Sequence, residues 1–176
     1  MYHNVKIDPS AYIVPSANIV GNVTLGEECV VLFNATLRGD CNRKIVVGDR
    51  CNFQESVCVH VSIPSDTIIG NDVTVGHGAI IHGCTIEDEC IIGMGSIILD
   101  NAHIGKHCLV GAGALVTGGF VAPEGSLILG SPAKVVRALR DEEIAGLKES
   151  ADEYVEIGRN LHAEGLAMRG SDYTME

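Results

Sequence analysis

Three histidines have spacings that could serve metal chemistry: His60, His77 and His82. The last two lie five residues apart in VGHGAIIHGC (residues 75–84), a stretch otherwise made of glycine, aliphatic residues and one cysteine. Three imidazoles with a water in the fourth position form a typical catalytic zinc site. Five residues along a helix or a strand place two side chains on different faces, so the fold must explain how both histidines are used.

Aliphatic residues recur every six positions through most of the chain, and this repeat indicates which elements carry the histidines. The residue four positions further on is small or β-branched, which suits a tight corner. Each unit therefore reads as a short strand plus a corner, and stacked coils cover one another's apolar edges. The inward-facing series is Ile7, Ile13, Ile19, Leu25, Val31, Leu37, Val47, Phe53, Val59, Ile69, Val75, Ile81, Ile86, Ile92, Ile98, Ile104, Val110 and Val116.

The repeat pattern resembles that of the hexapeptide-repeat proteins, which form a left-handed parallel β-helix. The period shows that each unit has six residues. The resemblance implies three units per coil, a triangular prism and a left-handed helix. We therefore expect a mainly β fold with the β-helix over residues 1–130. Glycine is abundant, at 21 residues, and aromatic residues make up only 4 %, as a narrow and regular core requires.

The C-terminal part of the chain changes to a helical pattern. Pro132 follows a turn and suits a first helical position, and Asp141 can cap a further helix. Apolar residues then step by three and four positions along a strongly acidic segment, which predicts a helix packed along the prism. We expect a helical segment over residues 131–169 and a flexible tail over residues 170–176.

Two interruptions of the repeat predict loops. The inward residues Leu37 and Val47 are ten positions apart, as are Val59 and Ile69, four more than one repeat. The extra residues must bulge outward, at residues 38–44 and 62–66. Loops on a rigid scaffold often carry functional residues.

The repeat places His60 and His82 on one face, one coil apart. Each follows an inward residue, so both side chains point outward from strands roughly 4.8 Å apart. His77 lies on a different face near a corner and can reach the same point only from a second copy of the chain. Three prisms about a threefold axis would create three equivalent sites, so we expect a homotrimer with metal sites shared between subunits.

Several short motifs make the chain resemble the gamma-class carbonic anhydrases, and their short bacterial members in particular. The resemblance covers about residues 5–165. It implies that His60, His77 and His82 bind a metal, Zn²⁺ with Fe²⁺ or Co²⁺ as alternatives, and that His77 comes from the neighbouring subunit. The matching motifs are LRGD (37–40), NFQE (52–55), VH (59–60), VGH (75–77), HGC (82–84), GMGS (93–96) and GSPAK (130–134).

The same resemblance gives roles to three polar residues. It implies that Gln54 hydrogen-bonds the metal-bound water or bicarbonate, and that Arg38 and Asp40 form an interface pair that acts in catalysis or only holds the trimer. The expected reaction is the reversible hydration of CO₂ to bicarbonate. The loop after His60 is short and holds only Asp66, where the archetypal enzymes have a longer loop with a glutamate proton carrier. Glu55 and Tyr154 are the candidate substitutes.

Other functions remain open at this point. The fold would equally suit an acyltransferase that uses acetyl-CoA, with one histidine as the general base. A metal-binding homologue without CO₂ hydration, or one that hydrolyses thioesters at the same metal, also agrees with the residues.

Composition narrows the class of protein. The net charge is −11, which opposes nucleic-acid binding, and no apolar run approaches the length of a membrane span. The N-terminus has no cationic segment followed by an apolar one, so we expect a cytoplasmic protein. The seven cysteines include no CxxC pair, and four of them fall at small corner positions, which predicts reduced core residues. We expect the remaining histidines to be surface residues: His3, His103, His107 and His162.

Overall fold

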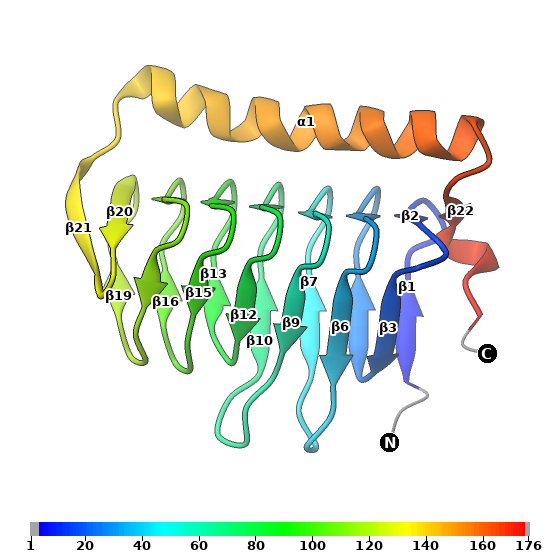
Figure 1. Cartoon of the computed structure of the whole chain (residues 1–176), viewed down its shortest axis with the longest axis horizontal. Helices are drawn as coiled ribbons and strands as arrows, with labels where there is room; N and C mark the ends of the chain where they lie inside the picture. The colour runs from blue at the N-terminus through cyan, green and yellow to red at the C-terminus, as the bar shows by residue number, and fades with distance from the viewer. Residues whose placement is uncertain (1–3, 175–176) are drawn as a thin grey trace.

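The computed structural model describes residues 4–174 as a triangular prism of short strands with one long helix along its side (Figure 1). From β1 to β20, successive strands pass through three sheets in turn, and each of them pairs in parallel with the strand one coil away; β21 and β22 pair antiparallel at the two edges of one sheet. The predicted left-handed β-helix with three six-residue units per coil is confirmed. Among the described residues, no helix is both long enough and apolar enough to cross a membrane.

The three sheets contain seven, nine and six strands. The seven-stranded sheet holds β1 (Val5–Ile7), β4 (Val23–Leu25), β7 (Ile45–Val47), β10 (Thr67–Ile69), β13 (Thr85–Ile86), β16 (His103–Ile104) and β19 (Val121–Ala122). The nine-stranded sheet holds β21 (Ala133–Ala138), β20 (Ser126–Gly130), β17 (Leu109–Val110), β14 (Ile91–Ile92), β11 (Thr74–Val75), β8 (Asn52–Phe53), β5 (Val30–Val31), β2 (Tyr12–Ile13) and β22 (Met168–Arg169). The six-stranded sheet holds β18 (Leu115–Val116), β15 (Ile97–Ile98), β12 (Ile80–His82), β9 (Cys58–His60), β6 (Thr36–Gly39) and β3 (Asn18–Gly21).

The inward residues of the repeat form one continuous core, in which Phe53 is the largest fully buried side chain. Glycine often follows the inward residue because neighbouring coils touch there. A Cβ on Gly26 would lie 2.5 Å from the carbonyl oxygen of Gly48, and one on Gly48 would lie 2.8 Å from that of Gly70. Backbone contact between coils therefore explains these glycines, and no phosphate-binding loop is needed.

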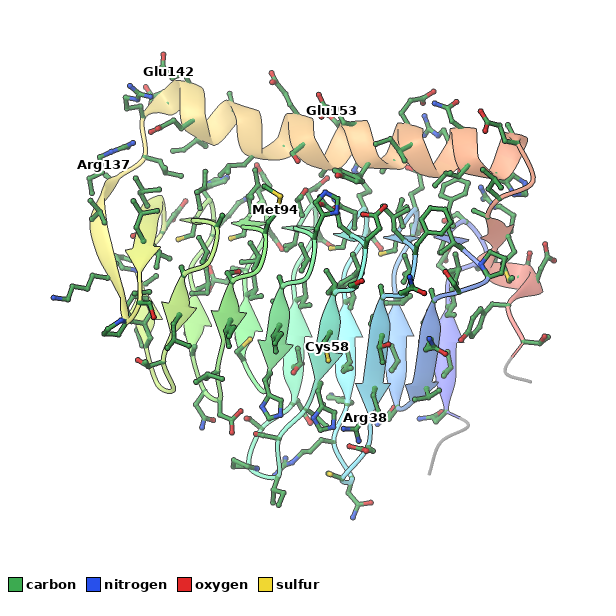
Figure 2. All side chains as sticks on the ribbon, viewed as in Figure 1. Arg38, Cys58, Met94, Arg137, Glu142 and Glu153 are labelled. Atoms are coloured by element: carbon green, nitrogen blue, oxygen red, sulfur yellow. The ribbon has the colours of Figure 1, made fainter. Side chains whose placement is uncertain are left out.

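All seven cysteines are free thiols. The four at corner positions are buried, as predicted, and each Sγ donates to a backbone carbonyl of the next coil; these are Cys29, Cys51, Cys90 and Cys108. Cys84 is also buried, and burial raises the pKa of its thiol to about 12. Cys41 and Cys58 are exposed, and Figure 2 shows Cys58 on the six-stranded sheet.

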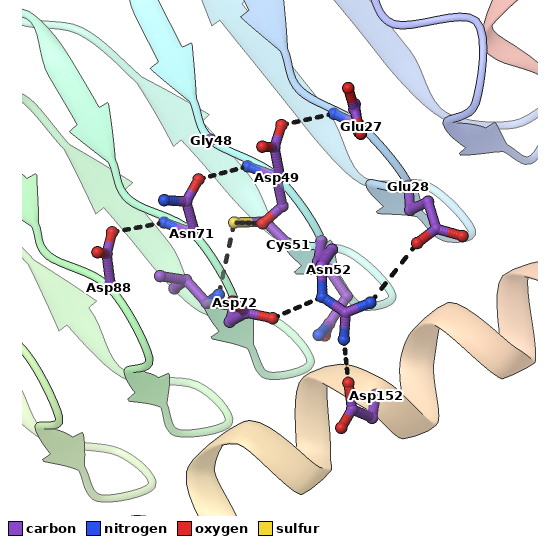
Figure 3. Close-up of polar contacts among 12 residues, drawn as sticks. Glu27, Glu28, Gly48, Asp49, Cys51, Asn52, Asn71, Asp72, Asp88 and Asp152 are labelled. Atoms are coloured by element: carbon purple, nitrogen blue, oxygen red, sulfur yellow. Dashed lines mark hydrogen bonds and ion pairs between the residues drawn. The ribbon is translucent and has the colours of Figure 1, made fainter.

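Side chains at one corner of the prism fasten the coils to each other (Figure 3). Three side chains in successive coils each accept a hydrogen bond of 2.8 Å from a backbone N–H of the coil before. The side chain of Asp49 accepts from Glu27, the side chain of Asn71 accepts from Asp49, and the side chain of Asp88 accepts from Asn71. The guanidinium of Arg50 contacts Glu28, Asp72 and Asp152. Asp152 belongs to the helix, so this cluster also ties the helix to the prism.

Helix α1 (Asp141–Ala163) packs along the nine-stranded sheet, where it contacts β2, β5, β8 and β11. Its buried residues are Leu147, Ala151, Val155 and Gly158. The predicted helix is confirmed, although the N-cap is Arg140, one residue before Asp141. The backbone N–H of Arg140 donates to the Glu143 carboxylate at 2.8 Å, and three acidic residues in the first turn favour the positive end of the helix dipole.

Two expectations for the C-terminal segment are corrected. The helix predicted to begin at Pro132 is wrong, because residues 133–138 form β21, which pairs antiparallel with β20 and completes the edge of the nine-stranded sheet. The tail is anchored over its described part: it follows β22, which pairs with β2, a 3₁₀ helix spans Gly170–Asp172, and Tyr173 Oη donates to the carbonyl of Ile19 at 3.1 Å. The last two tail residues, 175–176, lie outside the described residues.

The two predicted loops are confirmed at one edge of the six-stranded sheet, although residues 38–39 of the first belong to β6. Both bulge from the lower side of the prism in Figure 1, between β6 and β7 and between β9 and β10. They also contact each other: Arg43 Nε donates to the carbonyl of Ile63 at 2.9 Å, and the backbone N–H of Lys44 donates to Asp66 at 3.0 Å. The loops therefore hold each other beside the ends of the strands that carry His60 and His82.

Candidate metal centre

His60 and His82 lie side by side at the ends of β9 and β12, in register as predicted. Their side chains are partly exposed, and Nδ1 of His60 is 3.1 Å from Nε2 of His82. Two nitrogen ligands bound to a tetrahedral zinc ion at ordinary bond lengths are about 3.3 Å apart. The two imidazoles therefore have the separation that a shared metal ion requires.

Each of these imidazoles faces a carboxylate with its other ring nitrogen. His60 Nε2 is 2.9 Å from Asp40, and His82 Nδ1 contacts Asp100. A carboxylate only accepts hydrogen bonds at neutral pH, so these outer nitrogens carry the protons. In neutral imidazoles the two facing nitrogens then carry no proton, and their lone pairs oppose each other unless a cation or a proton lies between them. The arrangement fits a metal site, in which a ligating histidine almost always gives its other N–H to such an acceptor.

Arg38 and Asp40 form the pair that the sequence predicted. Arg38 lies beside His60 in the β6–β9 register, and its guanidinium contacts the Asp40 carboxylate. Asp40 is buried, and its hydrogen bond with His60, followed by one with the Cys41 thiol and then the charge of Arg38, holds the pKa of the carboxyl below its ordinary value. Asp40 is therefore ionised at neutral pH and available to accept the His60 proton.

His77 lies at the opposite edge of the six-stranded sheet, in the turn between β11 and β12. Its Nδ1 is 2.5 Å from Glu55 Oε2, and about half of its side chain is exposed. The backbone carbonyl of His77 accepts a hydrogen bond from the N–H of Gly95, which follows Met94 in the chain. The label of Met94 in Figure 2, beneath α1, therefore shows the corner of the prism at which His77 lies. Arg38 marks the other edge in the same view.

Gln54 and Tyr154 belong to the His77 edge. Gln54 is buried; its Oε1 accepts a hydrogen bond from the backbone N–H of His77 at 3.2 Å, and its Nε2 donates to Asn52 at 3.3 Å. Burial, and to a lesser extent the nearby charge of Glu55, raises the pKa of the Tyr154 hydroxyl. Gln54 and Glu55 thus contact His77, and neither has a hydrogen bond to the His60–His82 pair within residues 4–174.

The structure thus divides the predicted site residues between two edges. Arg38, Asp40, His60 and His82 lie at one edge, and Gln54 and His77 at the other. Within residues 4–174 no three histidine, cysteine, aspartate or glutamate side chains are grouped closely enough to hold a metal ion. A single chain brings two imidazoles together, and their role as metal ligands with a third histidine from another copy remains a prediction.

Asp100 is a site residue that the sequence interpretation did not identify. It lies in the turn after β15, two positions beyond Ile98, which pairs with Ile81. The repeat arithmetic could have placed this turn one coil beyond His82. With 23 acidic residues in the chain, however, nothing in the sequence marked this carboxylate as a partner of His82.

Contact with a carboxylate does not by itself mark a metal ligand in this chain. His103 lies 2.8 Å from Glu87, and His107 lies between Glu89 and Glu124. His162 contacts the carbonyl of Ala167, and His3 lies outside the described residues. Only His60 and His82, among the described histidines, bring two ring nitrogens together.

Comparison with known sequences finds two groups of relatives. The family model described as bacterial transferase hexapeptide (six repeats) matches residues 83–118. A Methanocaldococcus jannaschii protein named "Probable carbonic anhydrase" is 46 % identical over 157 residues, which is 89 % of this chain and 98 % of that protein. The Escherichia coli carnitine operon protein CaiE is 36 % identical over 89 % of this chain and 79 % of its own length.

A plant relative is longer than this chain. The mitochondrial gamma carbonic anhydrase 2 of Arabidopsis thaliana is 40 % identical over 163 residues, 89 % of this chain, but the match spans only 58 % of the plant protein.

Two solved structures are similar over nearly the whole chain. A Bacillus cereus protein provisionally named an acetyltransferase has a TM-score of 0.88 and 42 % identity, over 90 % of this chain and 92 % of its own. A hexapeptide transferase family protein of Anaplasma phagocytophilum has a TM-score of 0.85 and 38 % identity, over 89 % and 92 %. The relatives thus carry names of three kinds: carbonic anhydrase, carnitine operon protein and transferase.

Proposed function

The chain belongs to the gamma carbonic anhydrase family of hexapeptide-repeat proteins, and from that premise we propose that it hydrates CO₂ reversibly to bicarbonate at metal sites shared between the subunits of a homotrimer. One observation carries the proposal: His60 and His82 direct two ring nitrogens at one point, 3.1 Å apart, while carboxylates contact their other nitrogens. That geometry supports a metal site.

The proposed ligands are His60 and His82 of one subunit and His77 of the partner subunit. A bound Zn²⁺ ion would lower the pKa of water to about 7 and so supply hydroxide at neutral pH; Fe²⁺ and Co²⁺ remain alternatives. Asp40 and Asp100 hold the imidazoles of their own chain, and Glu55 holds His77 in the same way. Three carboxylates thus orient the three proposed ligands.

Gln54 and Arg38 are the proposed residues for substrate. Gln54 hydrogen-bonds the backbone of its neighbour His77, so it would act in whichever site that histidine enters, where its carboxamide would orient the oxygen atoms of CO₂ or bicarbonate. Arg38 brings a positive charge to the His60 edge of an otherwise acidic protein, which favours an anionic product. The role of Arg38 and Asp40 in holding the trimer together remains an alternative to a catalytic one.

Proton transfer would involve groups at the His77 edge. Glu55 contacts His77 and is partly exposed, so it can exchange protons with solvent. The raised pKa of Tyr154 keeps its hydroxyl protonated at neutral pH. Asp66, in the short loop after β9, instead accepts a backbone hydrogen bond from Lys44.

An acyltransferase that uses acetyl-CoA is the second candidate. It is favoured by the 42 % identity to the Bacillus cereus protein, and an imidazole paired with a carboxylate, as in His82–Asp100, also suits a general base. It gives no role to the second imidazole that faces the first. A metal-binding homologue without CO₂ hydration is a third candidate. We propose a cytoplasmic location, although the Arabidopsis relative is named mitochondrial.

Metal analysis combined with a rate measurement distinguishes these functions. The protein is purified with and without oxygen, its zinc, iron and cobalt are measured, and CO₂ hydration is followed by stopped flow with a pH indicator. We expect one metal ion per chain and hydration that depends on it. Affinity for coenzyme A without bound metal would support the acyltransferase, and full metal content without hydration would support the metal-binding homologue.

A further inference from the structure

We propose that Asp100 is a positioning residue that fixes His82 in the tautomer whose Nε2 faces His60. The purpose of this role, metal binding by His82, rests on the proposed function. The contact between Asp100 and His82 is seen in the structure. The Asp100 carboxylate contacts His82 Nδ1, so that nitrogen carries the proton and Nε2 keeps its lone pair. Without an acceptor at Nδ1, a neutral imidazole can carry its proton on Nε2 instead. A protonated Nε2 has no lone pair with which to bind a metal.

The backbone around Asp100 is held by both neighbouring coils. The N–H of Asn101 donates to the carbonyl of Gly83 at 2.7 Å, and the carbonyl of Asp100 accepts from the N–H of Gly119 at 2.9 Å. These bonds fix the position from which the carboxylate reaches His82. They do not involve the carboxylate, so the fold can survive its removal.

Gly83 provides the space for this contact. Its φ of +58° is in the left-handed region, and a Cβ there would lie 3.0 Å from Asp100 Oδ1 and 2.7 Å from the hydroxyls of Ser62 and Ser65. Glycine directly after His82 therefore leaves room for the Asp100 carboxylate to approach the imidazole.

His82 has no other partner at Nδ1 among residues 4–174. Its Nε2 is directed at His60, and its Nδ1 contacts Asp100 alone. Both side chains of the pair are about one third exposed, so the hydrogen bond contributes little to folding stability. Its effect should therefore appear in tautomer and metal affinity, with little change in the unfolding temperature.

The experiment compares Asp100→Ala and Asp100→Asn with wild type. The first readout is the ring-nitrogen spectrum of His82, measured by long-range ¹H–¹⁵N NMR on metal-free protein at about pH 8.5, where ordinary imidazoles are neutral. The second is zinc affinity by competition with a chromophoric chelator. We expect the proton on Nδ1 in wild type, a shift toward Nε2 in Asp100→Ala, and zinc affinity about 10- to 100-fold weaker. Asp100→Asn should recover part of both, because its amide oxygen can still accept the Nδ1 proton.

Glu87→Ala is the matched control for Asp100→Ala. Glu87 makes the same kind of contact with His103, at 2.8 Å and with similar exposure, but away from the site. We expect its removal to leave the His82 spectrum and zinc affinity unchanged. If Asp100→Ala keeps the wild-type tautomer and its zinc affinity stays within about twofold, the positioning role is wrong.

The two readouts separate this inference from the proposed function. Wild type that binds zinc and hydrates CO₂, with Asp100→Ala unchanged in both readouts, would overturn the role of Asp100 alone. A tautomer shift in Asp100→Ala, in a protein that takes up no metal, would support the positioning role and overturn the proposed function.

Discussion

At the scale of single residues, the site depends on where protons sit on three imidazoles. Asp40, Asp100 and Glu55 each face one ring nitrogen of His60, His82 and His77, and leave the other nitrogen for a ligand. Hydrogen bonds to carboxylates set a histidine tautomer strongly. The carboxylates are therefore as much a part of the proposed centre as the histidines.

Replacing Gln54 with Ala tests the residue proposed to orient substrate. We expect metal content to stay at the wild-type level, because Gln54 contacts the backbone of His77 and not its ring. CO₂ hydration at saturating metal should fall about tenfold or more, by analogy with the loss of an oriented hydrogen-bond donor elsewhere. Hydration equal to wild type, measured per bound metal ion, would remove Gln54 from the mechanism.

The sequence predicted the placement of the histidines because the six-residue period fixes which face each residue occupies. It also identified Arg38, Asp40 and Gln54 through a family resemblance. It missed Asp100 because side-chain pairing depends on the height of each coil and on the space left by Gly83, and the acidic residues are too numerous to single out one.

At the scale of elements, α1 is held to the prism by close packing at one point and by charge at another. Gly158 faces Tyr12 and Val30, and a Cβ there would lie 2.8 Å from Tyr12 Cδ2 and 2.9 Å from Val30 Cγ2. Arg50 provides the charged contact with Asp152. The helix therefore approaches β2 and β5 most closely where it has no side chain.

Two glycine substitutions in α1 should have opposite effects. Gly158→Ala should lower the free energy of unfolding by about 1–3 kcal/mol, because Tyr12 and Val30 must move. Gly146→Ala is the control: no atom lies within 4 Å of its Cβ position, so it should raise stability by up to about 1 kcal/mol through helix propensity. Chemical denaturation measures both, and equal effects would contradict the packing described.

The elements show where local signals mislead. The apolar stripe with its steps of three and four correctly predicted α1, because that periodicity reports a buried helix face. Pro132 suggested another helix, but residues 133–138 complete the open edge of a sheet. The edge of a sheet is a tertiary feature, and neighbouring residues in the sequence do not reveal it.

At the scale of the whole molecule, stability should decline at both ends of the pH range. Hydrogen bonds lower the pKa of several carboxyls in the folded state, with Ser10 acting on Asp8 and His103 on Glu87. The unfolded chain then binds more protons, so stability should fall as the pH drops below about 4.5. Burial raises the pKa of the thiols of Cys51 and Cys84, so stability should also fall above their ordinary value of 9.0.

Thermal unfolding of metal-free protein from acid to alkaline pH checks this profile. Replacing Cys84 with Ala should weaken the alkaline decline, because the buried thiol is then absent. An unfolding temperature that keeps rising above pH 9.0 would contradict the buried, protonated state of these thiols.

The central claim is that each metal site needs two chains, and a complementation measurement tests it most directly. Chains with His77→Ala are co-expressed with chains carrying His82→Ala, and metal is measured per trimer against each variant alone. Either variant alone should bind no metal. In an equal mixture, every trimer with both kinds of chain has one complete site, so the total should be about one quarter of wild type. Full metal in His77→Ala alone, or no recovery in a mixture shown to contain mixed trimers, would contradict the shared site.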